Sequence, residues 1–112
     1  MAQDFRNALF REIGTSDQAL LAGGNYDAVI GIRCCNILTS TIAVDVKIAK
    51  SGADYFLAKG VVIPPNSAIE LIQGGAKIVL DSTNTLEAVS DTASSLDVTV
   101  SYFDTISSKE EL

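Results

Sequence analysis

The residue types that most often carry out chemistry in proteins are scarce in this chain. Its 112 residues include no histidine and no tryptophan, and its two cysteines, Cys34 and Cys35, are neighbours. Without histidine there is neither the commonest general base nor a Ser-His or Cys-His nucleophile pair. The remaining acids fall mostly in turns or at outward strand positions, where solvation accounts for them. We therefore expect a protein that is not an enzyme and uses no cofactor.

The adjacent cysteines argue against both a disulfide and a metal site. A bridge between neighbours would close a strained eight-membered ring, and a metal ion needs ligands that converge from several segments. In an extended strand the two side chains would point to opposite faces, so that one is a small core residue and the other faces outward. A reactive thiol is the alternative.

Two polar segments share only part of the pattern of ligand-binding loops. Gly74-Gly75 before Lys77 lacks the ordered positions of a phosphate loop and leads into a strand pattern instead of a helix. The segment 81–84, Asp-Ser-Thr-Asn, gathers oxygen atoms but lacks the spaced acids and distal glutamate of an EF-hand. Both are predicted to be turns, the second with an adventitious cation site as the alternative, and no metal site is predicted.

Composition and charge narrow the classes of partner. At 47% hydrophobic and 20% charged residues, the sequence is that of one compact globular domain. Its net charge of −6 would repel phosphate backbones, so nucleic acid is not an expected partner. The apolar runs are too short to span a membrane, and residues 1–7 do not resemble a secretory signal, which predicts synthesis in the cytoplasm.

The hydrophobic pattern is that of strands. Between residues 42 and 49, Ile42, Val44, Val46 and Ile48 alternate with more polar positions, as one buried and one wet face require. Similar runs recur along the chain, separated by turn residues such as Pro64-Pro65, which must end a strand or lie at an edge. We predict an all-β fold, a small β-sandwich or jelly roll of about seven to eight short antiparallel strands.

This pattern divides the chain into three parts. Residues 1–24 have the weakest regularity and are predicted to form an N-terminal arm or partly extended segment. Residues 25–106 contain the alternating runs and are predicted to form the sandwich domain. Residues 107–112 are predicted to be a polar tail.

Several apolar residues fall on faces that should be wet. They are Val29, Ile72, Val79, Val89 and Phe103. Either they are ordinary surface hydrophobes and residues in misjudged registers, or they are covered by partner subunits. On the second interpretation, the predicted assembly interface joins the arm to part of this outer face and consists of Phe5, Leu9, Phe10, Ile13, Ile72, Val79 and Phe103.

One segment carries a resemblance to a known group of proteins. In residues 54–104, Tyr55, Leu57, Lys59, Ile63, Pro64, Pro65, Ser67, Glu70 and Leu71 match the stretch "YxLxKxxxIPPxSxxEL". Gly74, Gly75, Lys77, Ile78, Val79 and Leu80 match the hairpin "GGxKIVL" that follows. Both stretches are similar to small β-sandwich proteins encoded among the virion genes of tailed bacteriophages. The match covers a little under half the chain.

The resemblance implies a structural role in a virus particle. On that basis we expect a capsid decoration or cement protein, assembled in the host cytoplasm and located in the virion. Its expected partners are other copies of itself, most plausibly as a trimer, and the major capsid or other virion proteins. A neck or tail accessory protein is one alternative, and a tail-fibre adhesin domain that binds a host glycan or receptor is another.

Overall fold

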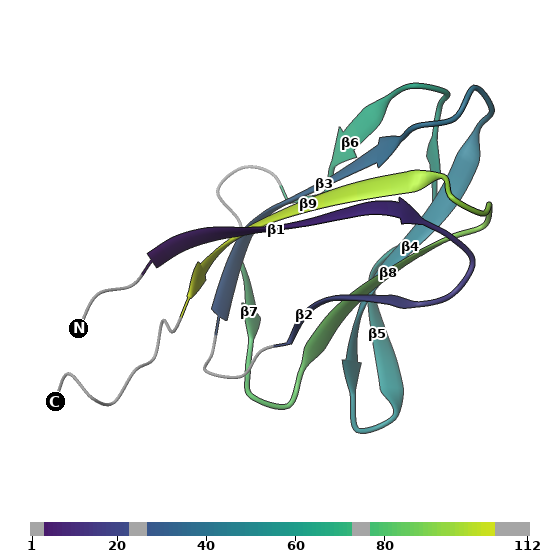
Figure 1. Cartoon of the computed structure of the whole chain (residues 1–112). Helices are drawn as coiled ribbons and strands as arrows, with labels where there is room; N and C mark the ends of the chain where they lie inside the picture. The colour runs from purple at the N-terminus through teal and green to yellow at the C-terminus, as the bar shows by residue number, and fades with distance from the viewer. Residues whose placement is uncertain (1–3, 23–26, 73–76, 105–112) are drawn as a thin grey trace, which may run out of the picture.

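The chain folds into two antiparallel β-sheets packed face to face (Figure 1). The computed structural model describes residues 4–22, 27–72 and 77–104, and within these ranges it contains no helix. The nine strands are β1 (Asp4–Ile13), β2 (Gln18–Ala22), β3 (Asp27–Asn36), β4 (Ile42–Lys50), β5 (Ala53–Ile63), β6 (Ala68–Glu70), β7 (Ile78–Leu80), β8 (Thr85–Ser90) and β9 (Leu96–Asp104). The predicted all-β fold is confirmed.

The strand order defines the architecture more closely. Sheet A has the order β1-β9-β3-β6, with β7 also paired to β3, and sheet B has the order β2-β8-β4-β5. Because β6 pairs with residues 33–35 of β3 and β7 with residues 27–29, these two short strands share one edge position. The pairings are therefore nested: β1 with β9, β2 with β8, β3 with β6 and β7, and β4 with β5. Such nesting is what a single long hairpin gives when it is wound up, and it is the connectivity of a jelly roll.

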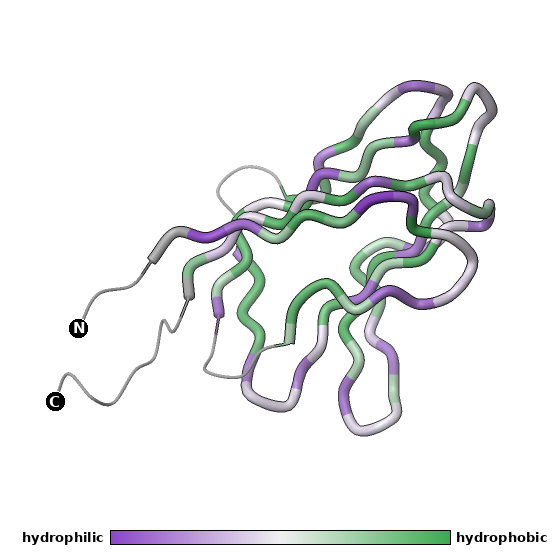
Figure 2. Tube along the Cα trace, in the orientation of Figure 1, coloured by the Kyte–Doolittle hydropathy of each residue, from purple (hydrophilic) through white to green (hydrophobic). Residues whose placement is uncertain are grey.

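The core lies between the sheets, as the alternating patterns require. Figure 2 shows hydrophobic and hydrophilic residues following one another along the strands. In β4, the residues predicted to face inward are buried, except that Ile48 is partly exposed, and Lys47 on the other face is buried as well. In β9, Leu96, Val98 and Val100 alternate with less buried residues in the same way. The core consists of Ile13, Leu20, Val29, Ile32, Cys34, Ile42, Val44, Val46, Ala58, Ile63, Ile72, Leu80, Leu86, Ala88, Leu96, Val98 and Val100.

Residues 1–24 were predicted to be an N-terminal arm or partly extended segment, and the described part of them, residues 4–22, contains two extended strands that belong to the sandwich. β1 pairs with β9 in sheet A, and β2 pairs with β8 in sheet B. Apolar residues on both faces of β1, such as Leu9 and Phe10, hide its period of two. In β2 a register shift between Ala19 and Leu21 breaks the alternation in the same way. The start of the chain therefore supplies one edge strand to each sheet.

Two residues that were predicted to lie on wet faces, Val29 and Ile72, are buried instead. Val29 was predicted to face outward but is fully buried, because the pairing of β3 with β9 shifts between Val29 and Gly31. Ile72 is also buried, and it lies beyond the end of β6, where strand alternation no longer applies. Residues 53–63 form one strand, β5. It ends directly before Pro64-Pro65, as predicted.

Two predictions fall outside the described residues. They are the turn at Gly74-Gly75 and the polar tail at 107–112.

Candidate functional site

Side chains that could hold a metal ion do not gather in the described part of the chain. No three Cys, Asp or Glu side chains within residues 4–22, 27–72 and 77–104 are close enough together to hold a metal ion. Cys34 is fully buried, and this desolvation, with a smaller effect of the Glu70 carboxylate, raises the pKa of its thiol to about 12. A thiol that stays protonated at neutral pH is a poor nucleophile.

The two cysteines are placed as the strand interpretation predicts. Both are free, Cys34 is buried in the core, and Cys35 is half-buried on the other face of β3. The described elements also include no helix long and apolar enough to cross a membrane. Exposed apolar side chains and strand edges are the candidate functional features of the described elements.

The seven residues of the predicted assembly interface do not form one surface. Ile13 and Ile72 are only 3% and 7% exposed and belong to the core, so their side chains are not available to a partner in this fold. Leu9 and Val79 are 67% and 55% exposed, but they lie on β1 and β7, at opposite edges of sheet A. Of the remaining three, Phe10 and Phe103 are partly buried, and the side chain of Phe5 lies outside the described part of the structure.

Exposed apolar side chains concentrate instead on β5, an edge strand of sheet B. Tyr55, Phe56, Leu57 and Val62 are all more than a third exposed. Phe56 is opposite Lys47 in the pairing with β4, and the Lys59 ammonium lies 4.4 Å from the centre of its ring. A cation over an aromatic face is attracted to the ring quadrupole. The Phe56 ring is thus partly covered within the protomer.

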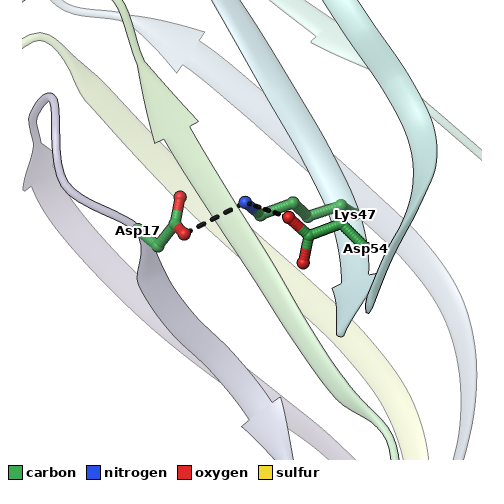
Figure 3. Close-up of polar contacts among 3 residues, drawn as sticks. All are labelled: Asp17, Lys47 and Asp54. Carbon is green, nitrogen blue, oxygen red and sulfur yellow. Dashed lines mark hydrogen bonds and ion pairs between the residues drawn. The ribbon is translucent and has the colours of Figure 1, made fainter. Parts of the chain in front are cut away.

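A buried lysine, Lys47, forms two ion pairs on the outer face of sheet B, next to Phe56. Lys47 projects from β4, its side chain is only 8% exposed, and its Nζ lies 3.0 Å from Asp17 Oδ2 and 3.1 Å from Asp54 Oδ2 (Figure 3). Hydrogen bonds to Asp17 and then to Asp54 outweigh desolvation and raise the pKa of Lys47 above its ordinary value. Asp17 lies just before β2 and Asp54 on β5, so this ionic clamp ties together the two edges of sheet B.

The sheet edges differ in how well they are protected from pairing. The pairing of β5 with β4 contains two register shifts, and Gly60 of β5 has φ 65°. β2 is five residues long with one shift, and β6 and β7 have three residues each. Bulges and short strands are the usual devices that blunt an edge.

β1 has no such protection over most of its length. From Asp4 to Phe10 it pairs with β9 in an unshifted register, and the first shift falls between Phe10 and Ile13. Within the described residues β9 is the only strand that pairs with β1, so its other edge is open. That edge carries Leu9, which is the most exposed of the large hydrophobic residues described. The β1 edge is the candidate interaction site.

An open groove lies next to this edge. It has a volume of about 650 Å³ and is lined by Arg6, Asn7, Ile30, Ser101 and Tyr102, from β1, β3 and β9. Ile30 lies at the bulge of β3 that buries Val29. The groove combines an aromatic residue with amide, hydroxyl and guanidinium groups, which is a composition suited to a polar ligand.

No protein-family model matches the chain, and no curated protein has a significantly similar sequence.

Proposed function

We propose that the chain is a non-enzymatic structural protein of a tailed bacteriophage virion, where it acts as a capsid decoration or cement protein. Its location is then the virion, after assembly in the host cytoplasm, and its partners are further copies of itself and the major capsid proteins. The observation that carries the proposal is the jelly-roll connectivity, an architecture that recurs in viral capsid proteins. Because lectins and cupins share this architecture, the fold alone does not decide the function. The exposed surfaces of the protein must also be suited to a structural role.

The surfaces support an architectural role. The described residues form no metal cluster, and the buried cysteine is protonated, so nothing in them favours the metal chemistry of a cupin. The open edge of β1 offers backbone groups to another chain. A protein that acts by pairing and packing needs such an edge and no reactive centre.

The segment that resembles virion proteins also has an architectural place in the fold. Its Ile63 is a fully buried core residue at the end of β5. The carbonyl oxygens of Ile63 and Pro64 accept hydrogen bonds from Asn36 Nδ2 at 3.0 and 3.1 Å. These motif residues therefore join the two sheets, which supports a resemblance in fold.

Binding to particles tests the proposal. The purified chain is added to virions of the source phage from which it has been removed or deleted, and bound protein is measured by co-sedimentation and by cryo-electron microscopy. We expect saturable binding at symmetry-related positions of the head lattice and greater resistance of the particles to heat. Density at the neck or tail alone would favour the neck or tail accessory protein, and absence of binding would contradict a virion role.

The groove beside β1 favours a second candidate, a tail-fibre adhesin domain. Tyr102 and the polar side chains of Arg6, Asn7 and Ser101 are groups that commonly contact sugars. Titration of the chain with host surface glycans tests this function, with a Tyr102→Ala variant as the comparison. Saturable binding that the variant loses would favour the adhesin, and equal or absent binding would exclude the groove as its site.

A further inference from the structure

We propose that β1 pairs antiparallel with β1 of a second copy, so that the two copies of sheet A form one continuous sheet across a two-fold axis. The inference rests on the self-association in the proposed function and names the surface that performs it. It begins from the contrast between the edges, because β1 alone among the described edge strands offers seven consecutive residues in unshifted register. Long regular edges are the ones that pair with other chains.

The register of the pair follows from the unshifted stretch. Two strands related by a two-fold axis through the sheet pair residues of like parity, because side chains alternate between faces and each face must continue across the junction. The register that pairs all of residues 4–10 with the same residues of the second copy has Asn7 at its centre. It places Asn7 opposite Asn7 and Leu9 opposite position 5, which is Phe5.

The side chains at these positions are compatible with this register. Leu9 is exposed in the single protomer. In the pair it lies opposite position 5 of the second copy, which is also an apolar residue. Arg6 faces Ala8, so no two like charges lie directly opposite each other, which would be unfavourable. Shifting the centre by one residue to Ala8 would instead place Asp4 opposite Glu12, two acids.

Charge makes a second copy a suitable occupant of this edge in particular. The chain as a whole carries −6, which disfavours association of its other surfaces. β1 contains two acids, Asp4 and Glu12, and two arginines, Arg6 and Arg11, so the strand itself is neutral. Two copies can approach along it without the repulsion that the whole-chain charge predicts. The assembly is then a two-fold pair and not the trimer expected from the sequence.

The position of Asn7 on the axis gives a direct test of the pairing. Asn7→Lys puts two ammonium groups opposite each other, and Asn7→Asp puts two carboxylates there, so we expect each variant to weaken the dimer at least about tenfold. A one-to-one mixture of the two variants places opposite charges on the axis and is expected to restore the dimer. Sedimentation velocity over a concentration series measures all three samples.

Two controls separate this effect from a general effect of charge or folding. Asn7 is exposed, so circular dichroism and thermal melting should match the unmodified chain for both variants. Thr39 is exposed in the β3–β4 loop, and Thr39→Lys and Thr39→Asp carry the same charge changes away from β1. Dimers that survive both Asn7 substitutions, a mixture that stays monomeric, a trimeric mass or a monomeric unmodified chain would each overturn the proposal.

Cross-linking tests the register. With Asn7→Cys, the two cysteines of a pair lie directly opposite, about 4.5–5.5 Å apart between Cα atoms, which suits a disulfide. With Leu9→Cys, the two cysteines are offset by four residues, roughly 13 Å, which is too far. We expect rapid oxidation to a covalent dimer for the first variant only. Equal cross-linking of both, or cross-linking of Leu9→Cys alone, would refute the register centred on Asn7.

Particle binding by the same variants separates this inference from the proposed function. If Asn7→Lys is monomeric yet binds virions as the unmodified chain does, the β1 pair stands and the particle contact uses another surface. If the β1 pair is confirmed but no sample binds virions, the pairing stands and the virion role fails.

Discussion

Asn36 Nδ2 donates a 3.0 Å hydrogen bond to the carbonyl oxygen of Ile63, which ties the end of β3 in sheet A to the end of β5 in sheet B. The same nitrogen lies 2.7 Å from the carbonyl oxygen of Ser40, and the Asn36 side-chain oxygen accepts from the backbone N–H of Leu38 at 2.9 Å. The Asn36 side chain is fully buried, so water cannot take over its hydrogen bonds to the backbone if it is removed. One amide thus fixes the β3–β4 loop against the opposite sheet.

Replacing Asn36 should therefore destabilise the whole sandwich. Asn36→Ala removes hydrogen bonds inside the protein and leaves buried backbone groups without their partner, which we expect to cost about 3 kcal/mol. Asn36→Asp should cost at least as much, because a carboxylate would face carbonyl oxygens. Urea denaturation measures both. Ser40→Ala is the control, because Ser40 takes part through its backbone, and a loss similar to that of Asn36→Ala would contradict the assignment.

The Lys47 clamp predicts strong non-additivity between its two acids. Either Asp17→Asn or Asp54→Asn alone leaves Lys47 with one carboxylate, and each acid is about half exposed, so each substitution should cost less than about 1 kcal/mol. The double substitution leaves a buried ammonium without a carboxylate and should cost about 3 kcal/mol. A double-mutant cycle measured by urea denaturation tests this, and additive costs would show that Lys47 does not bridge the two acids.

The same clamp has a definite dependence on pH. Because Asp17 and Asp54 raise the pKa of Lys47, the folded protein retains this proton above pH 10.5, where the unfolded chain releases it. The contribution is fully present below that pH and is lost as pH rises through the higher pKa of the folded state. Relative to Lys47→Met, the unmodified chain should therefore lose its advantage in thermal stability only in strongly alkaline buffer. A loss already at neutral pH would contradict the raised pKa.

Burial of Cys34 predicts a difference between the two thiols. At pH 8 the native protein should react quickly with a thiol reagent at Cys35 at most, and the denatured protein at both cysteines. Above pH 9 the unfolded chain loses the Cys34 proton while the folded chain holds it to about pH 12, so this group should lower stability by about 1.4 kcal/mol per pH unit. Cys35→Ser isolates Cys34, and rapid native labelling of that variant would show that the thiol is accessible.

The sequence predicts those features of the fold that depend on neighbouring residues, and it does not predict those that depend on pairing between distant strands. The period of two in β4 and β9, the turn signals and Pro64-Pro65 are local, and from them the all-β class and the end of β5 were predicted correctly. Residues 1–24 were predicted to be an arm or partly extended segment because their pattern is the least regular, and only the pairing of β1 with β9 shows that residues 4–13 are a strand of the sandwich. The bulge that buries Val29 likewise depends on a partner strand far away in the sequence.

The candidate site shows the same limit. Of the residues assigned to the assembly interface, Leu9 is exposed, whereas Ile13 and Ile72 complete the core. Lys47 was placed correctly on the outer face of β4, but its burial depends on Asp17 and Asp54, which are 30 and 7 residues away. Alternation gives the face of a strand, and it does not give the neighbours on that face.

Substitutions at Gly60 test whether the bulge in β5, which protects this sheet edge from pairing, requires glycine. Its φ of 65° is in the left-handed region, and a Cβ there would meet no atom within 4 Å, so the cost of a side chain is conformational and not steric. Gly60→Ala should therefore lower the free energy of unfolding by about 1 kcal/mol, and Gly60→Asn by less, because asparagine adopts this conformation more readily. Gly60→Val should cost most, since β-branched residues tolerate this conformation least.

A control separates the backbone preference from a nearby hydrogen bond. The backbone N–H of Gly60 donates to Asp45 Oδ1 at 2.7 Å, so Asp45→Ala serves as a comparison that removes this contact without changing the backbone preference. The ranking Asn, Ala, Val in order of increasing cost, measured by urea denaturation, would confirm a conformational origin. Equal stability of all three variants would contradict it.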